Sequence, residues 1–156
     1  MDEAEGMRAA IEACREGMRK GQSPFGSAIQ HPQHGLVTAH NSVWLDTDPS
    51  AHAEVNAIRK TASLHGSIDL GGAVLYSTCE PCPMCLTAIH WAKIDRVVYG
   101  ADIADAEAAG FSELRISARS MVEQGGSHLI VEGGVMAAEC RRLFDEWKAQ
   151  SLHRSY

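Results

Sequence analysis

Two short segments of this sequence carry side chains that could do chemistry together: His52-Ala53-Glu54 and Pro81-Cys82-Pro83-Met84-Cys85. One imidazole and two thiolates form a ligand set that suits zinc. A structural zinc takes four protein ligands, whereas a catalytic zinc keeps one position for water. Because Glu54 stands beside the three ligands without being needed by the metal, the pattern predicts a hydrolytic zinc centre.

The charges of these residues suit the activation of water. The thiolates of Cys82 and Cys85 cancel the +2 charge of zinc, and His52 binds as a neutral ring. A water on such a metal loses a proton near pH 7. We expect Glu54 to take that proton and to hand it on to the substrate.

The cysteine spacing leaves other metal chemistry open. Cys79 extends the motif to C-x-x-C-x-x-C, and with His90 it could complete a closed, four-ligand structural zinc site. An iron–sulfur cluster lacks the fourth cysteine of the usual spacing. A non-catalytic zinc module therefore stays as an alternative from another functional class, while we expect Cys79 to be a buried neighbour of a catalytic site.

Composition limits the class of protein. The chain has 156 residues, of which 45% are hydrophobic and 22% charged, and we expect one domain over residues 1–156. The net charge of −6 argues against a broad phosphate-binding surface. Five cysteines and an acidic N-terminus without an apolar core indicate a cytoplasmic protein. No apolar run reaches the length of a membrane span.

Apolar periodicity and turn residues divide the chain into alternating elements. Polar caps such as Asp48, followed by Pro49, mark helix starts. The alternation predicts an α/β domain with helices on both faces of one sheet. The expected helices cover residues 3–20, 48–64, 82–92, 104–110, 112–124 and 135–147, and the expected strands cover residues 25–30, 36–43, 73–77, 96–100 and 128–131.

The spacing within each motif indicates how these elements position the site. Cys82 and Cys85 are three residues apart, which places both sulfurs on one side of a helical first turn. His52 and Glu54 are two apart, so they reach one site only if it lies off the start of their helix. We therefore expect two helix N-termini to converge at the carboxyl ends of neighbouring strands.

The H-x-E…P-C-x-x-C pattern is typical of zinc nucleobase deaminases, and the sequence resembles the cytidine deaminase-like superfamily. Within it, the sequence is most similar to the small guanine deaminases of bacterial type, over about residues 5–113. This resemblance implies a three-layer α/β/α sandwich with a mixed sheet of about five strands. It rests on residues 24–26, 41, 48–55, 79–85 and 106–111, and on Glu113.

The resemblance implies roles for the residues of the metal motif. His52, Cys82 and Cys85 would hold Zn²⁺, and Glu54 would shuttle protons. Glu113 falls where the family has a second acid, which contacts the amino-bearing edge of the purine and assists proton transfer. A solvated helix residue is the structural alternative for Glu113.

The resemblance also implies substrate-binding residues: Phe25, Asn41, Ala53, Trp91 and Tyr156. Asn41 would read the base through its amide, Phe25 and Trp91 would line the base pocket, and Tyr156 would close it. Structural roles stay open here as well, namely a turn cap for Asn41 and core packing for the two aromatic residues.

We therefore predict zinc-dependent hydrolytic deamination of a nucleobase, with guanine converted to xanthine and ammonia. The expected partners are a small purine and a second copy of the chain in a homodimer, without membrane or nucleic acid. Residues 132–147 resemble the closing segment of the tRNA-specific adenosine deaminases, so that activity is the first alternative, although it would need a basic surface. Guanosine, cytosine or a triazine as substrate is another.

Overall fold

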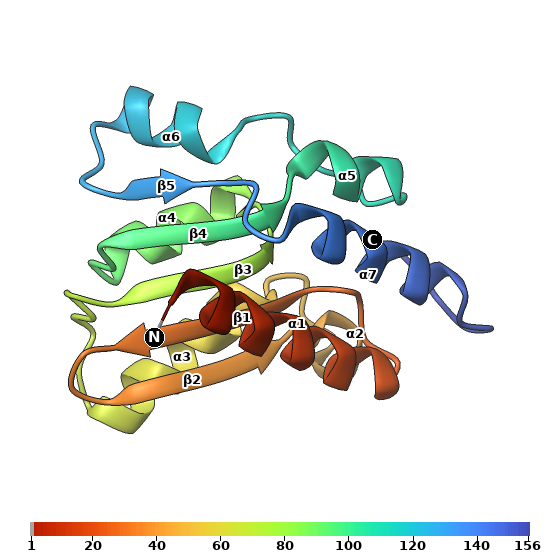
Figure 1. Cartoon of the computed structure of the whole chain (residues 1–156), viewed down its shortest axis with the longest axis horizontal. Coiled ribbons are helices and arrows are strands. Elements are labelled where there is room, and N and C mark those ends of the chain that lie inside the picture. Colours follow the sequence, from red (N-terminus) through yellow and green to blue (C-terminus); the bar gives the residue numbers. More distant parts are fainter. Residues whose placement is uncertain (1) are drawn as a thin grey trace.

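The computed structural model describes residues 2–156, which are built around one five-stranded sheet (Figure 1). The strands are β1 (Gly26–His31), β2 (Gly35–His40), β3 (Val74–Cys79), β4 (Arg96–Ala101) and β5 (Ile130–Glu132). They lie in the order β2-β1-β3-β4-β5. β1 runs antiparallel to β2 and β3, whereas β3, β4 and β5 are parallel. The predicted mixed sheet is confirmed.

Helices cover both faces of this sheet and complete the predicted three layers. Tyr76 and Val98 pack into one core cluster with α1 and α7, in front of the sheet in Figure 1. Their strand neighbours Leu75 and Val97 point the other way, into a second cluster with α3, α4 and α6. No helix within residues 2–156 is both long and apolar enough to cross a membrane. The helices are α1 (Glu3–Arg19), α2 (Val43–Asp46), α3 (Ala53–His65), α4 (Pro83–Trp91), α5 (Ile103–Ala108), α6 (Ala118–Gly125) and α7 (Ala137–Lys148).

Helix α1 crosses the start of β1 at close range. A Cβ atom on Gly26 would collide with the carbonyl oxygen of Ala10 and the amide of Cys14, so only glycine fits there. The Gly26 amide also donates to the hydroxyl of Thr78 on β3, at 3.1 Å. This packing fixes the position of Phe25, the residue before β1.

The helix predicted from residue 48 begins later, at Ala53. Asp48 accepts bonds from the Ser50 amide (2.8 Å) and hydroxyl (2.7 Å), so it closes a local turn rather than capping a helix. The short helix α2, which no sequence pattern predicted, precedes that turn. Its C-cap is Thr47, whose backbone lies in the left-handed region with φ 50. The true cap of α3 is His52, in an extended conformation.

The helix predicted over residues 112–124 also begins later, at Ala118. Residues 111–117 form an irregular segment between α5 and α6. Its apolar residues Leu114 and Ile116 are 65% and 43% exposed, so they supply no buried face that could stabilise a helix. Ser117 caps α6 by accepting a bond from the Ser120 amide at 3.1 Å.

Candidate active site

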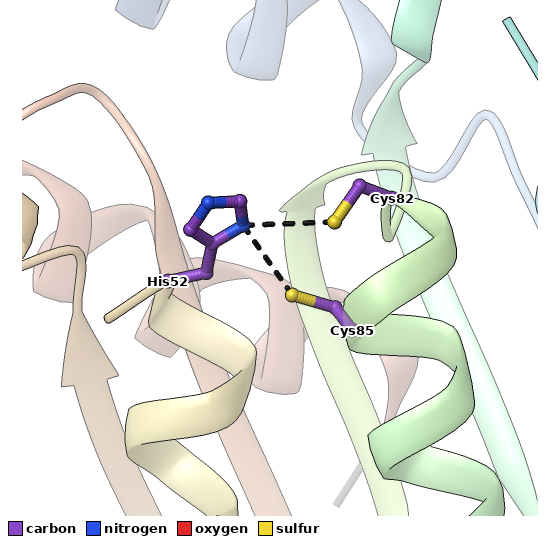
Figure 2. Close-up of side chains that lie close together, drawn as sticks. All are labelled: His52, Cys82 and Cys85. Carbon is purple, nitrogen blue, oxygen red and sulfur yellow. Dashed lines mark hydrogen bonds between the residues drawn. The ribbon is translucent and has the colours of Figure 1, made fainter. Parts of the chain in front are cut away.

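Two helices begin side by side, and each begins with a predicted metal ligand. His52 is the N-cap of α3 and Cys82 is the N-cap of α4, while Cys85 lies one turn into α4. Figure 2 shows these three side chains pointing toward one another from the two helix starts. The structure therefore has the convergence of helix N-termini that the motif spacing predicts.

The ligand nitrogen of His52 lies at the distance from both sulfurs that a tetrahedral zinc requires, and the three ligand atoms lie within 4.8 Å of one another. The Nδ1 atom of His52 lies 3.6 Å from the Cys82 sulfur and 3.5 Å from the Cys85 sulfur. Bonds of about 2.3 Å to sulfur and about 2.0–2.1 Å to nitrogen at tetrahedral angles separate nitrogen and sulfur by about 3.6 Å. The donor set and its spacing thus fit zinc, with Nδ1 as the coordinating nitrogen of His52.

The two thiols differ in their readiness to ionise. Hydrogen bonds from Cys85 and from His52 lower the pKa of Cys82 to about 4, against the opposing effect of burial. The hydrogen bond to Cys82 and burial raise the pKa of Cys85 well above its usual range. A thiol must lose its proton to bind a cation, and Cys82 loses its proton more readily than Cys85.

Glu54 lies directly beside this group, in the first turn of α3 and only 5% exposed. Burial raises the pKa of its carboxyl group. The Ser77 hydroxyl on β3 lies 3.2 Å from Oε1 of Glu54 and 2.7 Å from the carbonyl oxygen of Cys79, and both are acceptors. No motif in the sequence predicts this role of Ser77, because its partner Glu54 lies 23 residues away.

A small cavity of about 20 Å³ opens between these residues, enough for about one water molecule. Glu113 reaches it from the irregular segment between α5 and α6. Burial, with a further contribution from the charge of Cys82, raises the pKa of Glu113 to about 7. Phe25, His52, Glu54, Cys79, Glu80, Cys82, Glu113 and Tyr156 line the cavity.

A model of the cytidine and deoxycytidylate deaminase zinc-binding region matches residues 1–101 of the chain. The chain belongs to this deaminase family. Guanine deaminase from Bacillus subtilis is 45% identical over 107 residues, which are 68% of each chain. The tRNA-specific adenosine deaminase of the same species is 35% identical over 61% of this chain and 59% of its own. A solved structure in complex with 8-azaguanine matches 94% of this chain and 84% of its own, with a TM-score of 0.85 and 25% identity.

The other cysteine and histidine near the deaminase motif do not join the ligand group. The Cys79 thiol donates to the carbonyl of Asp102 at 3.5 Å, and burial raises its pKa well above the usual range. His90 pairs instead with the Ser127 hydroxyl, 2.6 Å from its Nδ1. Across residues 2–156, the only gathered group is His52, Cys82 and Cys85. A closed four-ligand site therefore lacks its fourth ligand.

The segment that ends at Tyr156 folds back over the cavity. Tyr156 accepts a hydrogen bond of 2.7 Å from Nδ2 of Asn41, and its carbonyl oxygen accepts one of 2.9 Å from the Ser112 amide. Its ring meets Phe111 edge-on, 5.1 Å between centroids. Asn41 is fully buried and reaches the cavity only through Tyr156, because its Oδ1 accepts from the Val43 amide.

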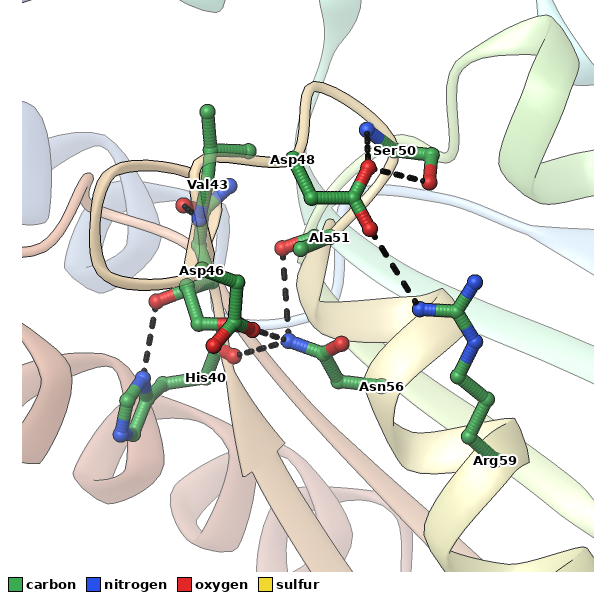
Figure 3. Close-up of polar contacts among 10 residues, drawn as sticks. His40, Val43, Asp46, Asp48, Ser50, Ala51, Asn56 and Arg59 are labelled. Carbon is green, nitrogen blue, oxygen red and sulfur yellow. Dashed lines mark hydrogen bonds and ion pairs between the residues drawn. The ribbon is translucent and has the colours of Figure 1, made fainter.

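Asn56 holds the loop between β2 and α3, which carries Asn41 and leads to His52. No motif in the sequence predicts this role. Nδ2 of Asn56 lies 2.9 Å from the His40 carbonyl, 2.9 Å from the Ser42 hydroxyl and 3.3 Å from the Ala51 carbonyl (Figure 3). An asparagine one turn after a helix start is the only sequence signal for this contact.

Besides Asn41, two more predicted substrate-binding residues do not line the cavity. Trp91 is the last residue of α4, at the opposite end from Cys82, and it is 75% exposed. The prediction that Trp91 lines the pocket is therefore corrected, because the first turn of α4 lies at the metal site and its last turn lies away from it. Ala53 is fully buried and packs in the core beside Phe25.

Proposed function

We propose that this chain is a zinc-dependent guanine deaminase, which hydrolyses guanine to xanthine and ammonia. The observation that carries the proposal is the group of His52, Cys82 and Cys85, which leaves one position of a tetrahedral metal for solvent, beside the buried Glu54. The guanine deaminase relative supports guanine as the base.

Zinc held by these three residues would supply a Lewis acid that lowers the pKa of water to about 7. The Glu54 carboxylate accepts the proton that this water loses and delivers it to a ring nitrogen beside the amino-bearing carbon. Glu113 assists by protonating the departing amine, which leaves as ammonia, and it regains a proton from the hydroxyl group on the same carbon as that group becomes the carbonyl of xanthine. The pKa of Glu113, raised to about 7, suits a group that takes up and releases protons near neutral pH, and burial raises the pKa of Glu54 as well.

The aromatic residues enclose the base in this proposal. Phe25 and Tyr156 line the cavity, and their flat rings suit a purine face. A cavity of about 20 Å³ is too small for a purine, so the tail that carries Tyr156 moves away when the base enters. Undocking frees the amide of Asn41 to bind the base edge.

We further propose that residues 1–156 act as one domain, in a cytoplasmic homodimer that takes a small purine. All five cysteines are free thiols, which agrees with a reducing compartment. The net charge of −6 disfavours RNA as the partner.

The test is ammonia release by purified, zinc-loaded protein from guanine, guanosine, adenine, cytosine and tRNA. We expect guanine to be the substrate, and Glu54→Gln to lower kcat roughly 10²- to 10⁴-fold with one zinc per chain retained. Glu113→Ala is expected to lower turnover of guanine strongly at unchanged zinc content.

The outcomes separate the alternatives. Release of ammonia from tRNA alone would replace the proposal by deamination of adenosine in tRNA, the activity for which the 35% identical relative from Bacillus subtilis is named. Release from no substrate, with a fourth protein ligand detected by X-ray absorption spectroscopy, would indicate a structural zinc module. Full activity of the Glu54→Gln variant would refute the mechanism.

A further inference from the structure

Glu80 is a buried carboxylate next to the metal motif, and it takes no part in the proton transfers proposed above. It lies between Cys79, which ends β3, and Pro81-Cys82, which start α4, and it is 8% exposed. Its two oxygens accept bonds from two different backbone amides: Oε1 from Ile103 at 3.1 Å and Oε2 from Ala118 at 2.8 Å. A buried carboxylate with both oxygens bonded is a strong and specific link.

The two amides belong to the first residues of two helices. Ile103 begins α5 and Ala118 begins α6, so each has an amide without a partner inside its own helix. A negative charge at a helix N-terminus is stabilised by the helix dipole. One carboxylate therefore joins the starts of α5 and α6 to the turn that presents Cys82.

The segment between those helices carries Glu113. Within residues 111–117, Phe111 is buried and Glu113 half-buried, while the others are exposed. The ion pair of Arg115 with Glu107 is on the surface, with Arg115 81% exposed, and such pairs hold little. The buried bond of Ala118 to Glu80 therefore anchors the far end of this segment.

We propose that Glu80 is a positioning residue, which couples the cysteine ligand turn to the segment of Glu113 and so sets where the Glu113 carboxyl lies in the cavity. This inference rests on the proposed role of Glu113 in deamination. Glu80 lines the cavity, but each of its oxygens accepts a bond from a backbone amide, so we assign it a positioning role rather than a part in proton transfer.

A double-mutant cycle tests the coupling. Glu80→Gln keeps the size of the side chain but places an NH₂ group against one of the two amides. We expect Glu80→Gln to lower kcat for guanine about 10-fold or more at one zinc per chain. In a Glu113→Gln background, the same substitution should lower kcat less than about 3-fold, because residues that act through one another are not additive.

Ser117→Ala is the matched control. It removes the cap of α6, a bond from the Ser120 amide, and leaves Glu80 and both of its amides in place. We expect a kcat near that of the wild type. Hydrogen exchange gives a second readout: Glu80→Gln should speed exchange at the starts of both α5 and α6, whereas Ser117→Ala should speed it only at the start of α6.

The inference would be overturned if Glu80→Gln lowered kcat by the same factor with and without Glu113→Gln. An equal loss of kcat in Ser117→Ala would overturn it as well. If the wild-type chain releases no ammonia from guanine, the proposed function fails, and hydrogen exchange alone tests the coupling. Faster exchange in Glu80→Gln at the start of α6 but not at the start of α5 would then overturn it. Should Glu80→Gln not fold, Glu80→Asp keeps the charge but is one methylene too short to hold both amides, and the same comparisons apply to it.

Discussion

Tyr156→Phe removes one hydroxyl group from the C-terminal tail, residues 149–156, and keeps the aromatic ring. It tests whether docking of this tail controls access to the cavity. In the docked tail, the hydroxyl accepts a bond of 2.7 Å from the fully buried amide of Asn41. The edge contact with Phe111 does not involve the hydroxyl, so the substitution isolates the hydrogen bond.

The cost follows from the burial of Asn41. A buried donor left without its acceptor costs about 1–3 kcal/mol, while in the undocked state water satisfies the same amide. The ratio of docked to undocked tail should therefore fall about 5- to 150-fold. We expect faster hydrogen exchange in residues 149–156 and a lowered KM for guanine, because the base then displaces a tail that is less firmly docked.

Trp44→Phe is the matched control for this prediction. Nε1 of Trp44 donates to the Arg154 carbonyl at 3.2 Å, and the Arg154 guanidinium lies 4.0 Å above its ring. This contact holds the same tail at an exposed position, where water replaces a lost bond. A smaller effect is expected. Unchanged exchange and KM in Tyr156→Phe, or an equal change in Trp44→Phe, would refute the reasoning.

Three further predictions concern metal, packing and pH. Dialysis against a strong chelator should abolish ammonia release and lower the melting temperature, and stoichiometric Zn²⁺ should restore both. Gly26→Ala forces a methyl group against the Ala10 carbonyl and should lower the free energy of unfolding by about 3 kcal/mol, measured by urea denaturation. Burial and the neighbouring charges of His34 and His31 lower the pKa of His65; the unfolded chain then binds the extra proton, so stability falls as the pH drops below about 6.5. His65→Gln should lose less stability than the wild type between pH 7.5 and 5.5, and an equal loss in both would contradict this.

The metal half of the site could be predicted from the sequence because its determinants are local. The spacing of Cys82 and Cys85 and that of His52 and Glu54 each constrain one helix start, and tetrahedral chemistry then brings the two starts together. The strands and most helices could be predicted from apolar periodicity, because that pattern is local as well. The errors at Asp48 and in residues 112–117 arose where a polar turn or an exposed segment carried a helix-like pattern without a face to bury.

The substrate half depends on contacts between distant parts of the chain. The amide of Asn41 meets Tyr156 across 115 residues, and Glu80 reaches Ala118 across 38. No spacing rule links such positions, since a buried carboxylate and a surface carboxylate look alike in a sequence. Trp91 was placed in the pocket on the family resemblance alone, but the axis of α4 carries it away from the site.

The docked tail also bears on the size of the substrate. Tyr156 lies over the cavity with its ring 5.7 Å from that of His52 and its hydroxyl bound to Asn41. A free base can be enclosed when such a tail docks again behind it. A nucleotide within RNA continues into a phosphodiester chain on both sides, so its backbone would have to pass through the position that the tail occupies. Closure by Tyr156 therefore favours a free purine over a nucleotide held in tRNA, because the tail encloses the base sterically. The net charge of −6 favours it too, because the chain has no excess of cationic residues to bind phosphates.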